Sequence, residues 1–229
     1  MNIAARYLGH SCVEFDFDGT KVLLDPFITH NPLASDALLG ELKPDYIFLS
    51  HGHADHVADA IGVQQSSGAT IVSIVELAAW VKKNGVAEDK VVEFNFGGTL
   101  DLPFGKVKMV YALHTSSTPD GEYAGVPCGF VFFVGDKKIY FAGDTALTME
   151  MKLLEDIGLD YAFLPIGGHY TMDMFDAVKA AQFINCKHII GVHYNTFPPI
   201  AIDTEKAISV FAASGLELQL PAIGATLTL

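Results

Sequence analysis

The chain has 229 residues, and with 50% hydrophobic and only 18% charged residues it is not intrinsically disordered. Its 14 Lys and Arg residues face 27 Asp and Glu residues, a formal net charge of −13, so no basic surface is expected for the phosphates of duplex nucleic acid. The length predicts one domain over residues 1–229, and the low charge with a mean hydropathy of +0.32 favours a homo-oligomer.

The first half of the chain predicts an antiparallel opening followed by alternating helices and strands. Residues 3–24 read as two or three short strands with Asp18-Gly19 as a hairpin turn. A loop is expected over residues 25–45, and the apolar run 46–49 predicts a strand buried on both faces. The elements expected next are a helix near 59–65, a strand at 70–73, a helix at 75–83 and a strand at 91–94.

The second half repeats this alternation. The expected strands are 107–113, 129–134, 138–142, 161–164 and 189–192, with two short strands at the end of the chain. The expected helices are 150–157, 173–184 and 204–213, and Asp173 is a candidate cap for the second of them. The order predicts an α/β fold in which two mixed β-sheets are flanked by helices, a four-layer α/β/β/α sandwich.

The cysteines and the apolar segments indicate a reduced, aqueous environment. Cys12, Cys128 and Cys186 lie far apart and form no C-x-x-C pair, which predicts buried reduced thiols. No apolar run approaches the roughly 18 residues of a membrane span, and the first residues do not read as a secretory leader. We therefore expect a cytoplasmic protein without a membrane partner.

The segment that carries the chemistry is Ser50-His51-Gly52-His53-Ala54-Asp55-His56, directly after the strand at 46–49. It holds three imidazoles and one carboxylate within six residues, on a loop that can aim several side chains at one point. A lone histidine is usually an ordinary core or surface residue, but this cluster at a strand end has no packing benefit. It predicts metal binding, and its spacing divides the four side chains into two pairs that need further ligands.

Further residues of the ligand type follow other predicted strands. His114, Asp144 and His193 come directly after the strands expected at 107–113, 138–142 and 189–192. Active sites of layered α/β folds collect at such strand ends, so this placement supports one shared site.

The order and spacing of these residues resemble the metallo-β-lactamase superfamily of hydrolases. The resemblance rests on the H-x-H-x-D-H run, the later isolated histidine, the Gly143-Asp144-Thr145 turn and the histidine near the end of the chain. Four further segments look like a branch of metal-dependent hydrolases that is similar to the lactonases acting on ascorbate 6-phosphate: residues 8–11, 24–27, 164–172 and 193–198.

The resemblance implies a dinuclear hydrolase acting on a small-molecule substrate. It assigns His51, His53 and His114 to the first metal ion and Asp55, His56 and His193 to the second, with Asp144 as the bridge. Two divalent ions, with zinc expected and Mn, Fe, Co or Ni as alternatives, would share a hydroxide that attacks a small ester, lactone or related carbonyl compound. Asp55 would orient that hydroxide or take its proton.

Three more residues are expected near the site. His169, after Gly167-Gly168, is the candidate proton donor to the leaving group or binder of the oxyanion. His10 and Asp25 either support the metal ligands or contact substrate. An apolar pocket wall is expected from Phe27, Tyr123 and Phe197.

Other activities compete with ester or lactone hydrolysis. A phosphodiesterase would suit the same dinuclear site, but no arginine lies near any motif to form a phosphate clamp. A di-iron oxidoreductase would need more carboxylate ligands and an attached flavin module, for which 229 residues leave no room. A binding protein without catalysis is disfavoured because all seven expected ligands are present.

Overall fold

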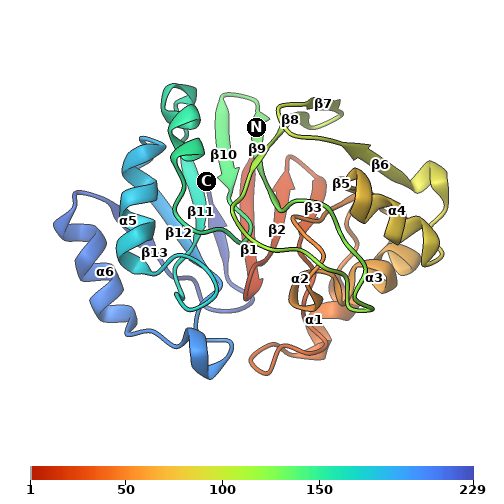
Figure 1. Cartoon of the computed structure of the whole chain (residues 1–229), viewed down its shortest axis with the longest axis horizontal. Coiled ribbons are helices and arrows are strands. Elements are labelled where there is room, and N and C mark those ends of the chain that lie inside the picture. Colours follow the sequence, from red (N-terminus) through yellow and green to blue (C-terminus); the bar gives the residue numbers. More distant parts are fainter. Residues whose placement is uncertain (1) are drawn as a thin grey trace.

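Two seven-stranded sheets form the centre of the computed structural model, which describes residues 2–229 (Figure 1). The first sheet contains, in spatial order, β14 (Thr226–Thr228), β1 (Ile3–Gly9), β2 (Cys12–Phe17), β3 (Thr20–Leu24), β4 (Tyr46–Phe48), β5 (Thr70–Ile74) and β6 (Val91–Phe94). The second contains β13 (Glu217–Gln219), β12 (His188–Val192), β11 (Tyr161–Pro165), β10 (Lys137–Phe141), β9 (Cys128–Val134), β8 (Gly105–Tyr111) and β7 (Thr99–Leu102).

Both sheets are mixed, as predicted. In the first sheet β14, β1, β2 and β3 pair antiparallel, whereas β3 to β6 pair parallel. In the second, β7 to β10 pair antiparallel and β10 to β13 pair parallel. As a result β8, β10 and β12 run in one direction and present their carboxyl ends at the same edge.

Helices cover the outer faces and complete the predicted four layers. The helices of the chain are α1 (Asp36–Glu41), α2 (Ala54–Val57), α3 (Ala60–Ser67), α4 (Val75–Lys83), α5 (Met174–Phe183) and α6 (Thr204–Ala213), with short 3-10 helices η1 (Glu88–Lys90), η2 (Met149–Ile157) and η3 (Pro198–Ile200). Figure 1 shows α3 and α4 on the side of the first sheet and α5 and α6 on the side of the second. Helix α4 contacts β5 and β6, whereas α5 contacts β11 and α6 contacts β13.

Aromatic rings lock the two sheets together. Phe15 and Phe48 of the first sheet meet Phe130, Phe132 and Phe163 of the second, with ring centroids 5.1–5.6 Å apart. All five are buried, and such pairs add about 0.5–1.5 kcal/mol each beyond the burial of their area. This packing fixes the strand ends of one sheet against those of the other.

The differences from the predicted elements are local. Helix α1 lies inside the expected loop 25–45, and it has no buried residue that would give an apolar period. Residues 149–157 form a 3-10 helix, whose buried Met151 and Leu154 are three residues apart and so match its period. Strand β7 and helix α2 were also not predicted.

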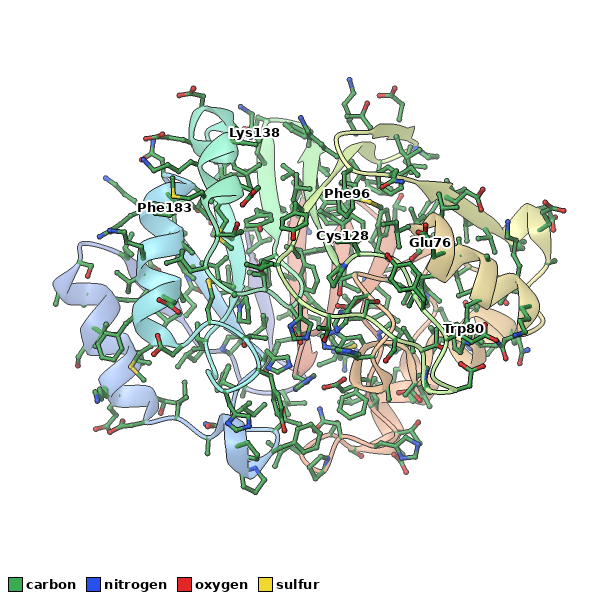
Figure 2. The ribbon with its side chains drawn as sticks, in the orientation of Figure 1. Glu76, Trp80, Phe96, Cys128, Lys138 and Phe183 are labelled. Carbon is green, nitrogen blue, oxygen red and sulfur yellow. The ribbon has the colours of Figure 1, made fainter. Side chains whose placement is uncertain are left out.

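Two smaller expectations, the Asp173 cap and the buried free cysteines, are confirmed. Asp173 caps α5 by accepting hydrogen bonds from the backbone of Phe175 and Asp176. The three cysteines are free and buried, with Cys128 near the centre of Figure 2. Across residues 2–229, none of the helices combines the length and apolar character needed to span a bilayer.

Candidate metal centre

The predicted ligands meet at one edge of the two sheets. His51 follows β4 of the first sheet, whereas His114, Asp144 and His193 follow β8, β10 and β12 of the second, each within three residues of the strand end. The parallel direction of the strands within each sheet therefore brings side chains distant in the sequence to one place.

The first group consists of His51, His53 and His114, which offer nitrogen atoms within 4.8 Å of one another. His51 Nε2 lies 3.0 Å from His53 Nδ1, and the His114 ring stands edge-on to both. Gly52 between the two histidines packs tightly, since a Cβ there would come within 2.4 Å of Ala124 Cβ. The group is thus held against the loop that follows His114.

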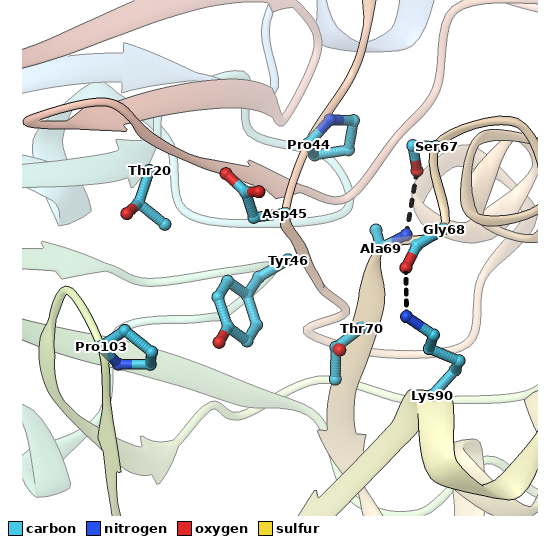
Figure 3. A pocket seen from close by; sticks show the side chains of 10 residues that line it. All are labelled: Thr20, Pro44, Asp45, Tyr46, Ser67, Gly68, Ala69, Thr70, Lys90 and Pro103. Carbon is cyan, nitrogen blue, oxygen red and sulfur yellow. Dashed lines mark hydrogen bonds between the residues drawn. The ribbon is translucent and has the colours of Figure 1, made fainter.

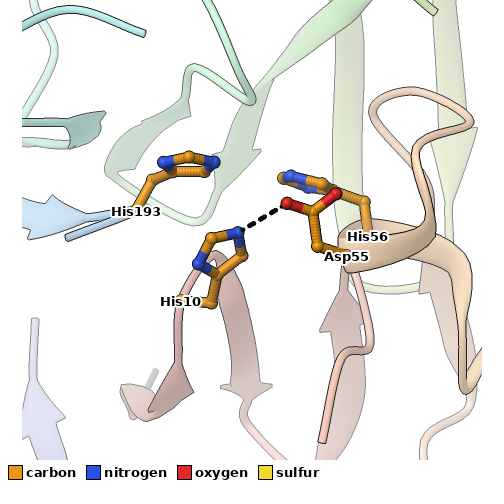
Figure 4. Close-up of side chains that lie close together, drawn as sticks. All are labelled: His10, Asp55, His56 and His193. Carbon is orange, nitrogen blue, oxygen red and sulfur yellow. Dashed lines mark hydrogen bonds and ion pairs between the residues drawn. The ribbon is translucent and has the colours of Figure 1, made fainter. Parts of the chain in front are cut away.

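The second group consists of Asp55, His56 and His193, together with His10 (Figure 4). Asp55 and His56 lie in the single turn of α2, while His193 comes from the other sheet. Their ligand atoms also lie within 4.8 Å of one another. Both sheets therefore contribute to this group.

Asp144 lies between the two groups. Its Oδ2 is 3.0 Å from His193 Nε2 and 3.3 Å from His56 Nε2, and also 3.7 Å from His114 Nε2 and 4.0 Å from His51 Nε2. The residue is 2% exposed. One buried carboxylate thus faces imidazoles of both groups.

Unpaired buried atoms show that these residues fit a metal ion. His56 Nε2, His193 Nδ1 and Asp144 Oδ1 have no hydrogen-bond partner among residues 2–229. Buried polar atoms are normally paired, and an unsatisfied one costs about 1–3 kcal/mol. Imidazole nitrogens and carboxylate oxygens are ligands of zinc and other divalent transition metals, so a metal ion bound beside them could satisfy such atoms.

Asp25 supports both groups through hydrogen bonds to His56 and Ser50. Its carboxylate is fully buried and accepts hydrogen bonds from Ser50 N at 2.8 Å, from Ser50 Oγ at 2.5 Å and from His56 Nδ1 at 2.8 Å. Ser50 Oγ also lies 3.0 Å from His51 Nδ1. Asp25 therefore orients one histidine of each group.

Burial holds the imidazoles of the first group in the neutral form that binds metal. It lowers the pKa of His51 well below the ordinary value, and it lowers the pKa of His53 and His114 as well. Metal ligation requires an unprotonated nitrogen, so these shifts favour ion binding near neutral pH.

The two carboxylates are held in their charged form. Burial raises the pKa of both, but for Asp55 the hydrogen bond from His10 and the nearby His56 outweigh it. For Asp144 the neighbouring His193 and His56 do so, and its pKa lies well below the ordinary value. Charged carboxylates offset part of the positive charge that two divalent ions would bring.

We expect the metal-free protein to lose stability as the pH falls below about 6.5, the ordinary pKa of histidine. Burial lowers the pKa of His10 to about 4 and that of His51 well below 6.5, so between these values the unfolded chain binds protons that the folded chain excludes. Each such proton lowers the free energy of unfolding by about 1.4 kcal/mol per pH unit. His56 adds no slope here: burial lowers its pKa, but Asp144 and Asp25 raise it above 6.5, so it is protonated in both states.

Urea unfolding of chelator-treated protein between pH 7.5 and 4.5 measures this slope. A His10→Leu variant should lose the contribution of about one proton, since only one titrating group is removed. An unfolding free energy that stays constant from pH 6.5 to 4.5 would contradict the prediction.

A cavity of about 380 Å³ opens onto the site and is lined by His53, Asp55, His114, Thr115, Asp144, Tyr170 and His193. Apart from the predicted ligands, its lining residues are Thr115 and Tyr170. Sequence reasoning missed Tyr170, although its position next to His169 in the Gly167-Gly168 turn was the available signal.

The residues predicted around the metal ligands do not all lie where they were expected. The apolar wall of Phe27, Tyr123 and Phe197 is wrong: Phe27 and Phe197 pack edge-on against the buried His10 ring, and Tyr123 is 67% exposed outside the cavity lining. Phe27 and Phe197 are therefore packed against a buried residue, and Tyr123 lies on the surface loop that follows His114. His169 is exposed on the turn beside Tyr170, whose ring it meets at 4.4 Å, and its role stays a prediction.

A second hollow, of about 340 Å³, lies at the opposite ends of β4 and β5 (Figure 3). Its Lys90 donates to the Gly68 carbonyl, and its carboxylate, Asp45, accepts from the backbone of Lys21. No histidine is among the described residues that line it. These polar groups serve the backbone and do not form a metal-ligand set.

Comparison with known proteins agrees with this geometry. The family model described as "Beta-lactamase superfamily domain" matches residues 20–194. A UPF0173 metal-dependent hydrolase of Christiangramia forsetii is 46% identical over 225 residues, 97% of this chain and 98% of the relative. Another from Thermus thermophilus is 43% identical over 215 residues, 94% of each chain.

A solved structure extends the similarity to three dimensions. Igni18, described as a novel metallo hydrolase from the hyperthermophilic archaeon Ignicoccus hospitalis, matches with a TM-score of 0.89 and 33% identity, covering 100% of this chain and 99% of Igni18. The predicted superfamily is thereby confirmed, while the narrower likeness to ascorbate 6-phosphate lactonases stays a prediction. The chain belongs to the β-lactamase superfamily and, within it, to the UPF0173 metal-dependent hydrolases.

Proposed function

We propose that this metal-dependent hydrolase acts on a small neutral ester, lactone or related carbonyl compound with a pair of divalent ions, zinc as the expected metal. His51, His53 and His114 hold the first ion, and Asp55, His56 and His193 hold the second. The observation that carries the proposal is the position of Asp144 Oδ2, within 4.0 Å of imidazoles from both groups. A single ion would not require a carboxylate between two groups.

Two such ions, when bound, supply a hydroxide near neutral pH and a Lewis acid for the substrate oxygen. The chain supplies the rest. Asp55, which lines the cavity with its side chain 33% exposed, orients the attacking hydroxide or takes its proton. Tyr170 and Thr115 are the hydroxyl groups available to bind substrate in the cavity. His169, on the rim turn, is the proposed proton donor to the leaving group.

The charge of the cavity favours a neutral substrate. No Lys or Arg is among the described residues that line it, and the whole chain carries a net charge of −13. Phosphate esters are usually gripped by arginine forks or lysine charges in addition to metal ions. The phosphodiesterase alternative therefore lacks the cation that it would use.

Metal analysis combined with a substrate panel tests this proposal. Protein purified without chelator should contain about two metal ions per chain, as a dinuclear hydrolase requires. It should hydrolyse lactones or carboxylic esters when Zn or Mn is supplied. Turnover of bis-p-nitrophenyl phosphate alone would support the phosphodiesterase, and failure to bind metal after reconstitution would exclude both activities.

A further inference from the structure

His10 contacts both halves of the second metal group (Figure 4). It occupies the turn between β1 and β2 of the first sheet, whereas His193 follows β12 of the second. Its Nε2 lies 3.2 Å from Asp55 Oδ2, and its backbone carbonyl accepts a hydrogen bond from His193 N at 2.8 Å. The His10 and His193 rings are 4.1 Å apart. His10 thus connects ligands that come from different sheets.

The hydrogen bonds of His10 distinguish it from the metal ligands around it. Its Nδ1 lies 3.0 Å from Thr196 Oγ1, so both ring nitrogens have protein partners. A carboxylate only accepts, which makes His10 Nε2 the donor to Asp55. By contrast, His56 Nε2 and His193 Nδ1 are buried without a partner. His10 therefore lies within ligand distance but has no nitrogen to spare for an ion.

The backbone and the packing fix the His10 ring in one orientation. His10 has a φ of +55°, a left-handed conformation that costs about 1–2 kcal/mol for a residue with a Cβ. The residue is 1% exposed, and the rings of Phe27 and Phe197 stand edge-on to it at 5.4 and 5.7 Å. Such strain persists only where the surroundings enforce it, and here they aim Nε2 at Asp55.

We infer that His10 is a positioning residue for the second metal group, which holds Asp55 by one oxygen and ties it to the His193 loop through Thr196. The consequence is selective: the second ion depends on His10, whereas the group formed by His51, His53 and His114 does not contact it. The inference rests on the ligand assignment of the proposed function. It leaves Asp55 Oδ1 as the oxygen available to an ion.

Metal titration of His10→Leu and His10→Gln tests the inference without reference to activity. In His10→Leu we expect one ion to bind as in the unmodified protein and the affinity for the second to fall about 10- to 100-fold, the usual effect of removing a partner behind a ligand. The glutamine amide can still donate to Asp55, so His10→Gln should recover most of the second-site affinity. Thr196→Val should also lower the affinity for the second ion, whereas Thr196→Ser, which keeps the hydroxyl group, should leave it unchanged.

Three further variants assign the surviving ion and control for the substitution. In the His10→Leu background, the remaining ion should survive an added His193→Ala change and be lost with His51→Ala. His30→Leu, the same substitution at an exposed histidine outside the site, should leave both affinities unchanged. If His10→Leu does not fold, Thr196→Val and His10→Gln carry the same comparison.

The outcomes separate this inference from the proposed function. Unmodified protein that binds fewer than two ions contradicts the dinuclear function itself. Two ions in the unmodified protein, with unchanged second-site affinity in His10→Leu or Thr196→Val, overturn the positioning role. Equal loss of both ions in either variant also overturns it, because a selective effect on the second group is what the geometry requires.

Discussion

Replacing Asp144 by alanine is expected to abolish metal binding and hydrolysis together. The change removes a buried carboxylate whose Oδ2 lies within 4.0 Å of four histidines from both groups, and so removes the negative charge at the point where those histidines converge. Metal ions contribute several kcal/mol to the stabilisation of charge in the transition state, and a loss of about 4 kcal/mol corresponds to roughly a 1,000-fold lower rate. We therefore expect kcat/KM to fall by at least about 1,000-fold.

Metal content and kcat/KM measured on the same preparation check this expectation. Asp136→Ala is the matched control, because Asp136 is an exposed aspartate in the turn between β9 and β10. Asp144→Asn keeps the shape but not the charge, and should lie between the two. An Asp144→Ala protein that retains two ions at unchanged affinity would show that the carboxylate does not bridge them.

Local sequence patterns were enough to predict that these ligand-type residues share one site, whereas their division into two groups was implied by the resemblance to the superfamily. The H-x-H-x-D-H run follows a short buried strand, and β8, β10 and β12 each lead to one further ligand-type residue. Because parallel strands end at one edge, strand order alone brings these residues near each other. The four-layer fold follows from the same alternation of strands and helices.

Contacts between distant segments could not be predicted in this way. Terminal strand β14 pairs with β1, with Leu227 opposite Ala5, and no local pattern encodes such a register. The same applies to His10, whose ring contacts Asp55, 45 positions away in the sequence, and Thr196, 186 positions away. Sequence reasoning left open whether His10 and Asp25 touch substrate or support the ligands; their side chains lie behind the ligands, and neither lines the cavity.

The direction of side chains in short turns could not be predicted from the sequence either. His169 and Tyr170 are neighbours on one turn, and either could have been the residue that faces the cavity. A left-handed φ of +58° at His169 turns the chain so that Tyr170 lines the cavity. Asp25 has a similar conformation, with a φ of +43°, so its buried carboxylate depends on a backbone shape that its sequence context does not reveal.

Removing the Asp25 carboxylate is expected to destabilise the protein by about 3–5 kcal/mol, the usual cost of breaking a buried charged pair by deleting one partner. In Asp25→Ala, His56 Nδ1 and the Ser50 amide lose their acceptor inside the core. Ser50 Oγ is freed at the same time, so His51 of the first group and His56 of the second both lose their orientation. We expect the affinity for both ions to fall.

The Asp18→Ala variant distinguishes the loss of the Asp25 hydrogen bonds from the cost of a left-handed backbone at an aspartate position. Asp18 has a φ of +54° but is exposed, so its replacement tests the same left-handed conformation without a buried network. The difference between the two variants in urea unfolding of the metal-free protein therefore measures the contacts of Asp25. If Asp25→Ala is no less stable than Asp18→Ala and still binds two ions, the buried carboxylate does not organise the metal centre. If Asp25→Ala is less stable and binds both ions more weakly, the result distinguishes Asp25 from His10. Replacing Asp25 should lower the affinity for both ions, whereas replacing His10 should lower the affinity for one.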